Sequence, residues 1–149
     1  MTKFQFLKFV HVLAAVIWVG GAFLILVLTV LSRRASVQYR HEFAKAIRGA
    51  TWIFDLSSVL VLGFGIWMVL DADPYGFDQA WILIGIAGLV LSVLFGLYVG
   101  PADKKMVARY EAGDSAAGDA LLERIWKVSL VYVAFLLFVI WAMVAKPGL

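Results

Sequence analysis

The sequence contains no cysteine among its 149 residues. Disulfides, thiolate metal sites and cysteine nucleophiles are therefore excluded. Charge is also scarce, because 15% of the residues are charged whereas 64% are hydrophobic, and no ordinary soluble domain carries such a composition on its surface. Phosphate-binding loops, catalytic triads, HExxH motifs and nucleic-acid-binding motifs are missing too. We expect an integral protein of a lipid bilayer that binds no nucleic acid.

Four long apolar runs make up most of the chain: 9–32, 49–70, 80–101 and 128–145. A hydrocarbon layer of about 30 Å needs about 20 residues of helix at about 1.5 Å per residue, and each run is close to that length. None of them alternates apolar and polar residues as a membrane-spanning strand would. The sequence therefore predicts an all-α fold, a single domain over 1–149, with four transmembrane helices in an up-down-up-down bundle.

Positive charges gather in two of the three connections. The connections after the first and third runs hold five Lys or Arg residues each of the 13 in the chain, while 71–79 holds three Asp and no basic residue. Basic connections face the cytoplasm. We therefore expect a multi-pass protein of a bacterial inner membrane with both termini outside. We also expect helix to continue through 39–48, and Asp119 to be the N-cap of a long last helix.

Small residues form a stripe along the third run. Gly85, Gly88, Ser92, Gly96 and Gly100 are spaced three or four apart and so share one helix face. Because apolar burial does not drive helices together in lipid, such a stripe indicates close helix contact. The contact could lie within one chain or in a homodimer, or a flat ring system could lie against the stripe.

The stretch KFVHVLAAVIWVGG, residues 8–21, places a histidine in an apolar run. His11 and Trp18 are seven residues apart and share a helix face. Such a histidine can hydrogen-bond a neighbour or lie at the membrane interface, bind haem or a metal, or carry protons. In an antiparallel bundle, Met68 and Met143 would lie at the same end as His11. An imidazole with a thioether suits haem iron or Cu(I). Methionine also commonly fills gaps in protein cores. These four residues are the candidate cofactor site, with His11 as the metal ligand.

The one carboxylate inside an apolar run is Asp55, two turns from Arg48 on the same helix face. An intramembrane Asp should face the bundle, where we expect Arg48, Tyr98 and Tyr132 as its partners. A satisfied contact between helices and a proton-handling role are both open. His11 lies roughly 20 Å away along the membrane normal, so the two do not form a catalytic pair.

The first-run pattern LKFVHVLAAVIWVGG, with His11, Trp18 and Gly21, resembles the membrane superfamily that includes the copper-resistance protein CopD and the bacterial protoporphyrinogen oxidase HemJ. The likeness continues through Arg48 and Gly49, LYVGPADKKM and the closing VAKPGL. Within the superfamily, the chain is most similar to a bacterial family of predicted four-helix membrane proteins with no assigned function.

The likeness to HemJ implies a haem-b-associated protein whose first-helix histidine is essential, a role that falls on His11. The chain departs from HemJ at Gly85, where HemJ has a lysine, and in ERIWKV, where HemJ has NExP. The likeness to CopD implies copper handling at the outer side through His11, Met68 and Met143. We therefore expect a haem b protein with a redox or electron-transfer role; the alternatives are a copper-handling protein and a non-enzymatic subunit of a membrane complex.

Overall fold

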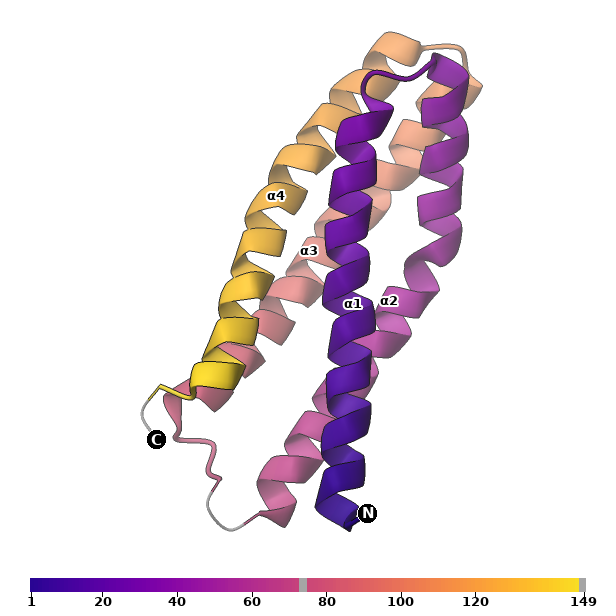
Figure 1. Cartoon of the computed structure of the whole chain (residues 1–149). Coiled ribbons are helices and arrows are strands. Elements are labelled where there is room, and N and C mark those ends of the chain that lie inside the picture. The colour runs from indigo at the N-terminus through magenta and orange to yellow at the C-terminus, as the bar shows by residue number, and fades with distance from the viewer. Residues whose placement is uncertain (73–74, 148–149) are drawn as a thin grey trace.

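The computed structural model describes residues 1–72 and 75–147, and these residues form four helices. The helices are α1 (Lys3–Ser32), α2 (Val37–Asp71), α3 (Ala80–Glu111) and α4 (Ser115–Ala145) (Figure 1). Each is long and apolar enough to cross a membrane. The chain is thus an all-α integral membrane protein with four candidate spanning helices, as the sequence predicts.

The helices run alternately up and down (Figure 1). We call the end where α1 begins and α4 ends the terminal end; at the loop end, 33–36 joins α1 to α2 and 112–114 joins α3 to α4. α1 packs mainly along α2, and α3 mainly along α4. The molecule therefore consists of two helical hairpins, which meet through less extensive contacts of α1 with α4 and of α2 with α3.

Polar side chains cap the starts of three helices. Thr2 and Gln5 form a capping box on α1, in which the Gln5 N–H donates to Thr2 Oγ1 at 3.2 Å and the Thr2 N–H donates to Gln5 Oε1 at 2.8 Å. Ser36 caps α2 and Asp114 caps α4. The expectation that Asp119 is an N-cap is wrong, because α4 begins more than a turn earlier.

The helices extend beyond the apolar runs at the loop end. α2 begins at Val37, which confirms the predicted helix through 39–48, and α3 continues past Pro101 to Glu111. A proline removes one backbone hydrogen bond, yet the helix persists because its last turns are buried against α2 and α4. The loop end has an apolar core of its own, formed by Ala44, Met106, Val107, Tyr110, Leu122 and Ile125.

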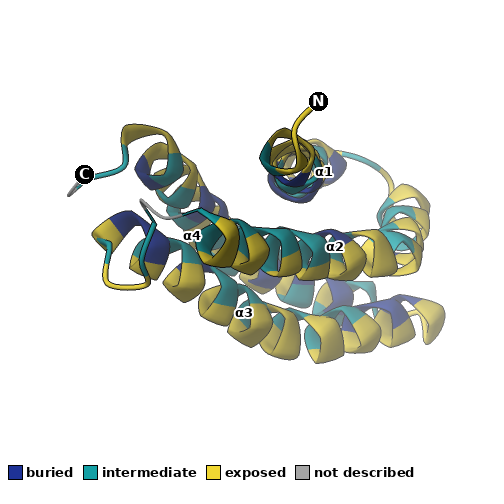
Figure 2. Cartoon of the chain, turned by 90° about the horizontal axis from the view of Figure 1, so that it is seen from below, coloured by how far each residue is buried: buried dark blue, intermediate teal, exposed yellow. Residues whose placement is uncertain are grey.

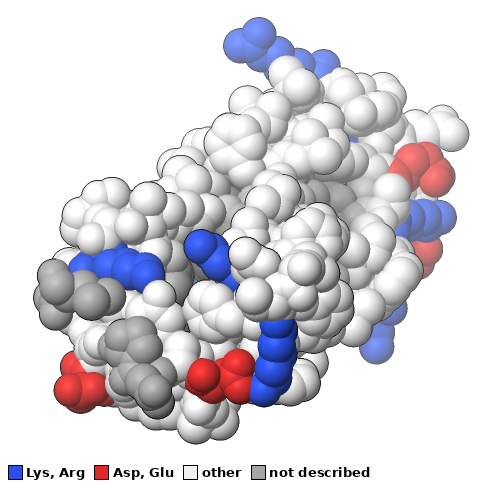
Figure 3. Space-filling view, turned by 60° about the horizontal axis from the view of Figure 1, so that its bottom comes forward, with Lys and Arg blue, Asp and Glu red and all other residues white. Residues whose placement is uncertain are grey.

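The outer surface between the two ends is largely apolar. Leu70, Leu97, Val131 and Val144 are each more than two-thirds exposed. Buried residues face the middle of the bundle and exposed ones its outside (Figure 2). On the face shown in Figure 3, charged side chains lie near the ends of the molecule with uncharged surface between them. This pattern fits a surface that lipid covers.

Inside each hairpin, side chains pack directly on glycines of the neighbouring helix. At Gly88, a Cβ would lie 2.9 Å from Cγ2 of Val139, so the valine occupies the space that a side chain would need. We call such a contact a glycine seat. The glycine seats pair Gly21 with Phe54, Gly65 with His11, Gly85 with Met143, Gly88 with Val139, and Gly118 with Tyr110.

The small-residue stripe of α3 is only partly used inside the molecule. Gly85 and Gly88 face α4, and Ser92 Oγ accepts a hydrogen bond from the Tyr132 hydroxyl at 3.0 Å. Gly96 and Gly100 are exposed, and no atom of a neighbouring helix lies within 4 Å of where their Cβ would be. The half of the stripe nearer the terminal end therefore packs within the chain, and the other half lies on the surface.

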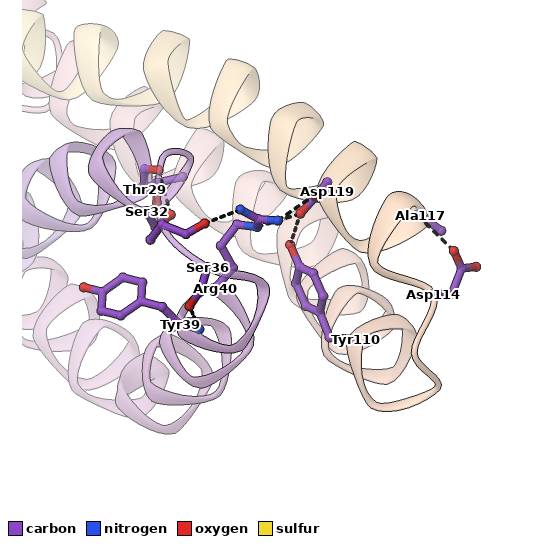
Figure 4. Close-up of polar contacts among 10 residues, drawn as sticks. Thr29, Ser32, Ser36, Tyr39, Arg40, Tyr110, Asp114, Ala117 and Asp119 are labelled. Atoms are coloured by element: carbon purple, nitrogen blue, oxygen red, sulfur yellow. Dashed lines mark hydrogen bonds and ion pairs between the residues drawn. The ribbon is translucent and has the colours of Figure 1, made fainter.

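At the loop end, a polar cluster joins the two hairpins (Figure 4). Arg40 on α2 faces Asp119 on α4 with both Nε, 2.8 Å from Oδ1, and Nη2, 3.0 Å from Oδ2. Arg40 Nη1 also donates to the Ala35 carbonyl at 2.6 Å, and the Tyr110 hydroxyl on α3 donates to Asp119 Oδ1 at 2.8 Å. We call Arg40, Asp119 and Tyr110 the loop-end clamp, because one carboxylate connects α2, α3 and α4.

Further ion pairs support the clamp. Arg33 pairs with Glu123 of α4 and lies 4.8 Å from the centroid of the Trp126 ring. Lys45 of α2 lies 3.8 Å from Glu111 of α3. Each of these contacts joins the first hairpin to the second, so charges at the loop end contribute to the relative position of the hairpins.

Replacing Gly88 by leucine should destabilise the second hairpin, because the new side chain must displace Val139. Overpacking of a tight contact costs about 1 to 3 kcal/mol. Gly96→Leu is the matched control, since it makes the same change on the same helix in open space. Thermal unfolding in mild detergent measures both variants, and equal melting temperatures would contradict the glycine seat.

Breaking the loop-end clamp should loosen the contact between the hairpins. The side chain of Arg40 is 13% exposed and that of Asp119 is 44% exposed, so loss of one partner leaves the other only partly solvated. We expect Arg40→Leu to lower the free energy of unfolding by about 1 to 2 kcal/mol in an SDS titration.

Asp119→Leu and the double variant complete a mutant cycle that isolates the pair. Arg34→Leu is the control, because the exposed Arg34 forms no ion pair with any described residue. If the losses in free energy of unfolding from the two single variants add up to that of the double variant, the pair does not stabilise the bundle. An equal loss from Arg34→Leu would lead to the same conclusion.

Candidate functional site

His11 lies in the interface between α1 and α2. Its Nδ1 is 2.8 Å from the carbonyl oxygen of Val61, and its ring sits on Gly65, where a Cβ would be 3.1 Å from Cε1. In a helix, the carbonyl of Val61 accepts from the N–H four residues later, which is that of Gly65. The missing side chain at position 65 therefore gives the imidazole access to a backbone carbonyl in the middle of a helix.

This contact determines the tautomer of neutral His11. A carbonyl oxygen only accepts hydrogen bonds, so Nδ1 must carry the hydrogen and donate it. Nε2 then keeps its lone pair, and the described residues give His11 no hydrogen bond other than the one at Nδ1. Metal-binding histidines are oriented in the same way, by a carbonyl or carboxylate at the other ring nitrogen.

The sequence allowed three interpretations of His11, and the structure bears on one of them. The hydrogen bond to a neighbour is confirmed, and it accounts for an imidazole inside an apolar helix. The ligand and proton-carrier interpretations stay predictions. They are compatible with this hydrogen bond because they use Nε2, the nitrogen that does not take part in it.

Trp18 lies two turns further along α1 and is buried. It packs with Val19 and Leu136 in the core between the hairpins, and its indole lies beside the hydroxyl of Tyr132. The side chain of Val61 packs against the same core. Trp18 therefore belongs to the contact between hairpins, and it is linked to His11 through the residue whose carbonyl holds the imidazole.

The two candidate methionines belong to different hairpins. Met143 packs on Gly85 of α3, and Met68 is half-buried on α2, three residues beyond Gly65. In the described part of the chain neither sulfur is hydrogen-bonded to His11. The grouping of the two methionines with His11 stays a prediction; of the two, only Met68 shares a helix with the residues that contact the imidazole.

Asp55 does not face the bundle, so the environment expected for it is wrong. Its side chain is exposed, Tyr98 is exposed on α3, and Tyr132 is bonded to Ser92 instead. The reason is the rotation of α2. Phe54 points toward α1, and the next residue of a helix is turned by about 100° from it, onto the outer face.

Arg48 is also exposed, and its charge acts on a residue that the sequence analysis missed. This residue is Asp103, which is half-buried on α3 and close enough for Arg48 to influence it electrostatically. Asp103 follows Pro101, where the apolar run ends, so its place in the sequence predicts a connection between helices. The loop-end clamp was missed for a similar reason, because nothing in the sequence relates Arg40 to Asp119 and Tyr110.

A family model described as "Predicted integral membrane protein (DUF2269)" matches residues 5–147. The chain belongs to this family. The match covers nearly all of the four helices and confirms the expectation of a family of predicted membrane proteins. The relation of the chain to CopD and HemJ stays a prediction. No curated protein and no solved structure shows significant similarity to the chain.

Gly65→Val should push the imidazole away from the Val61 carbonyl and lower the melting temperature, because a Cβ there already lies 3.3 Å from Nδ1. Gly63→Val is the matched control: it lies on the same helix, two residues away, with no neighbouring atom within 4 Å of its Cβ position. Thermal unfolding in mild detergent compares the two variants. Equal melting temperatures would contradict the contact between His11 and Gly65.

Proposed function

We propose that this chain is a haem-b-binding membrane protein with a redox or electron-transfer role, and that His11 would hold the haem iron. The observation that carries the proposal is the hydrogen bond from Nδ1 to the Val61 carbonyl. This bond orients the ring and leaves Nε2 with a lone pair for a metal. The likeness of the first helix to CopD and HemJ supports the same residue.

Small residues and one lysine lie near His11. Ala14 and Ala15 follow His11 along α1 and Gly65 faces it from α2, so small residues flank the imidazole. Lys8 is exposed three residues nearer the terminal end, where its charge could pair with haem carboxylates. The bound haem would supply one-electron chemistry, and the chain would supply the ligand, its orientation and an apolar surround.

A single chain offers one histidine for this role. His41, the other histidine, lies at the loop end with its Nε2 4.0 Å from Glu111. The chain's own candidate for a second residue that would hold the haem is Met68, three residues beyond Gly65 on α2. We propose that the basic loop end faces the cytoplasm of a bacterial cell, which places His11 in the outer half of the membrane.

The test is a dithionite-reduced minus oxidised absorption spectrum of protein purified in mild detergent from cells supplied with haem precursor. We expect a Soret band and b-type bands that His11→Ala abolishes. His41→Ala is the matched control and should leave the spectrum unchanged, because His41 lies at the opposite end. A flat spectrum of the wild-type protein at good haem supply would overturn the proposal.

Two further variants separate a ligand from a residue needed only for folding. Gly65→Val should alter the spectrum by displacing the imidazole, whereas Gly63→Val should not. Met68→Leu should shift the bands if the thioether is the second ligand. Cu(I) bound without a porphyrin spectrum would favour copper handling, and binding of neither group would favour a structural subunit.

A further inference from the structure

Asp55 lies deep within the membrane span. Its neighbour Phe54 packs on Gly21 in the middle of the apolar run of α1. Along α2, at about 1.5 Å per residue, Asp55 is about 10 Å from the level of Arg48 and about 24 Å from that of Asp71. A hydrocarbon layer of about 30 Å fits between the levels of Arg48 and Asp71. Asp55 therefore lies inside this layer, well away from both of its surfaces.

The carboxyl group of Asp55 has no partner among the described residues. Nearby hydroxyl hydrogens are used inside α2, since Ser58 Oγ donates to the Asp55 carbonyl at 2.8 Å and Thr51 Oγ1 donates to the Arg48 carbonyl at 3.0 Å. Lipid chains offer neither a donor nor an acceptor. Because an unpaired carboxyl group in lipid is costly, such groups are rare and are normally paired.

The helix that carries Asp55 presents a broad free face. α2 is the least buried of the four candidate spanning helices. One turn to either side of Asp55, Trp52 and Val59 are each 63% exposed. These three residues lie on one side of the helix, because positions three and four apart are neighbours on its surface. We call Trp52, Asp55 and Val59 the α2 outer face.

We propose that a second copy of this chain covers the α2 outer face, with the two α2 helices side by side and their Asp55 carboxyl groups hydrogen-bonded to each other. A two-fold axis along the membrane normal places every residue at the same depth as its copy. The second copy therefore brings to Asp55 what this chain lacks, a polar group at the same depth. A soluble partner could not reach it there.

The pair is stable when the two carboxyl groups retain a proton between them, because a protonated carboxyl donates to its partner while two carboxylates repel. Polar side chains are known to link membrane helices in this way. The free half of the α3 stripe makes a weaker case for a dimer. Gly96 and Gly100 leave only apolar surface, which lipid can cover without an unsatisfied polar group.

Crosslinking tests the proposal directly, because the chain contains no cysteine. Trp52→Cys and Val59→Cys should each crosslink to a second copy through a short bismaleimide, in vesicles of phosphatidylethanolamine and phosphatidylglycerol with lipid in large excess. Leu97→Cys on α3 and Val131→Cys on α4 are the matched controls. These positions are 68% and 71% exposed, and the two variants should not crosslink to a second copy.

The role of the carboxyl group is tested in the Val59→Cys background. Asp55→Leu should weaken association about tenfold, whereas Asp55→Asn should retain it, because two amides can also hydrogen-bond. In a detergent that keeps the protein monomeric, the melting temperature of Asp55→Leu should be no lower than that of the wild type, since leucine suits a face exposed to lipid. This comparison separates loss of the dimer from loss of the fold.

Three results would overturn the proposal. Crosslinking at Leu97 in place of Trp52 and Val59 would place the dimer on the α3 stripe. If Asp55→Leu does not reduce crosslinking through Val59→Cys, the two carboxyl groups do not hold the dimer together. A monomer in lipid, together with a different membrane protein that is retained by the wild type and lost in Asp55→Leu, would assign the α2 outer face to that protein.

Discussion

Close contact between a side chain and the bare backbone of a glycine is the interaction on which both hairpins depend. Inside a bilayer, lipid chains are as apolar as the helix surfaces, so contact between helices gives no hydrophobic gain. Helices therefore associate through van der Waals contact at short range. Phe54 on Gly21 and Val139 on Gly88 are contacts of this kind, one in each hairpin. They bring the backbones close together and set the register of the helices.

His11 uses the same kind of contact for a polar ring. Its seat on Gly65 brings Nδ1 to the Val61 carbonyl, so the imidazole is satisfied inside an apolar interface. The structural and the functional interpretations of His11 are therefore compatible with each other. The bond that stabilises the histidine in lipid is also the bond that would orient it for a metal, and Val61 links this site to the core around Trp18.

The two ends and the interior are held together by different forces. Beyond the apolar runs, Arg40 and Asp119 join the hairpins through charges, which keep part of their hydration there. Between the ends, packing around Trp18 and Leu136 holds them, and almost all outward side chains are apolar. Asp55 departs from this pattern, because its carboxyl group is exposed and has no partner among the described residues.

The sequence alone is enough to predict the class of protein, the four spanning helices and their alternating direction, because long apolar runs have few ways to satisfy their backbone in lipid. It also singled out His11 and Asp55, since polar groups in such runs are rare. What these residues contact, by contrast, depends on how the helices pack. Helix rotation turned Asp55 outward, the glycine at position 65 gave His11 a carbonyl, and residues distant in the chain formed the loop-end clamp. These outcomes depend on which face of each helix meets its neighbour, and nearly uniform apolar runs carry little information about that.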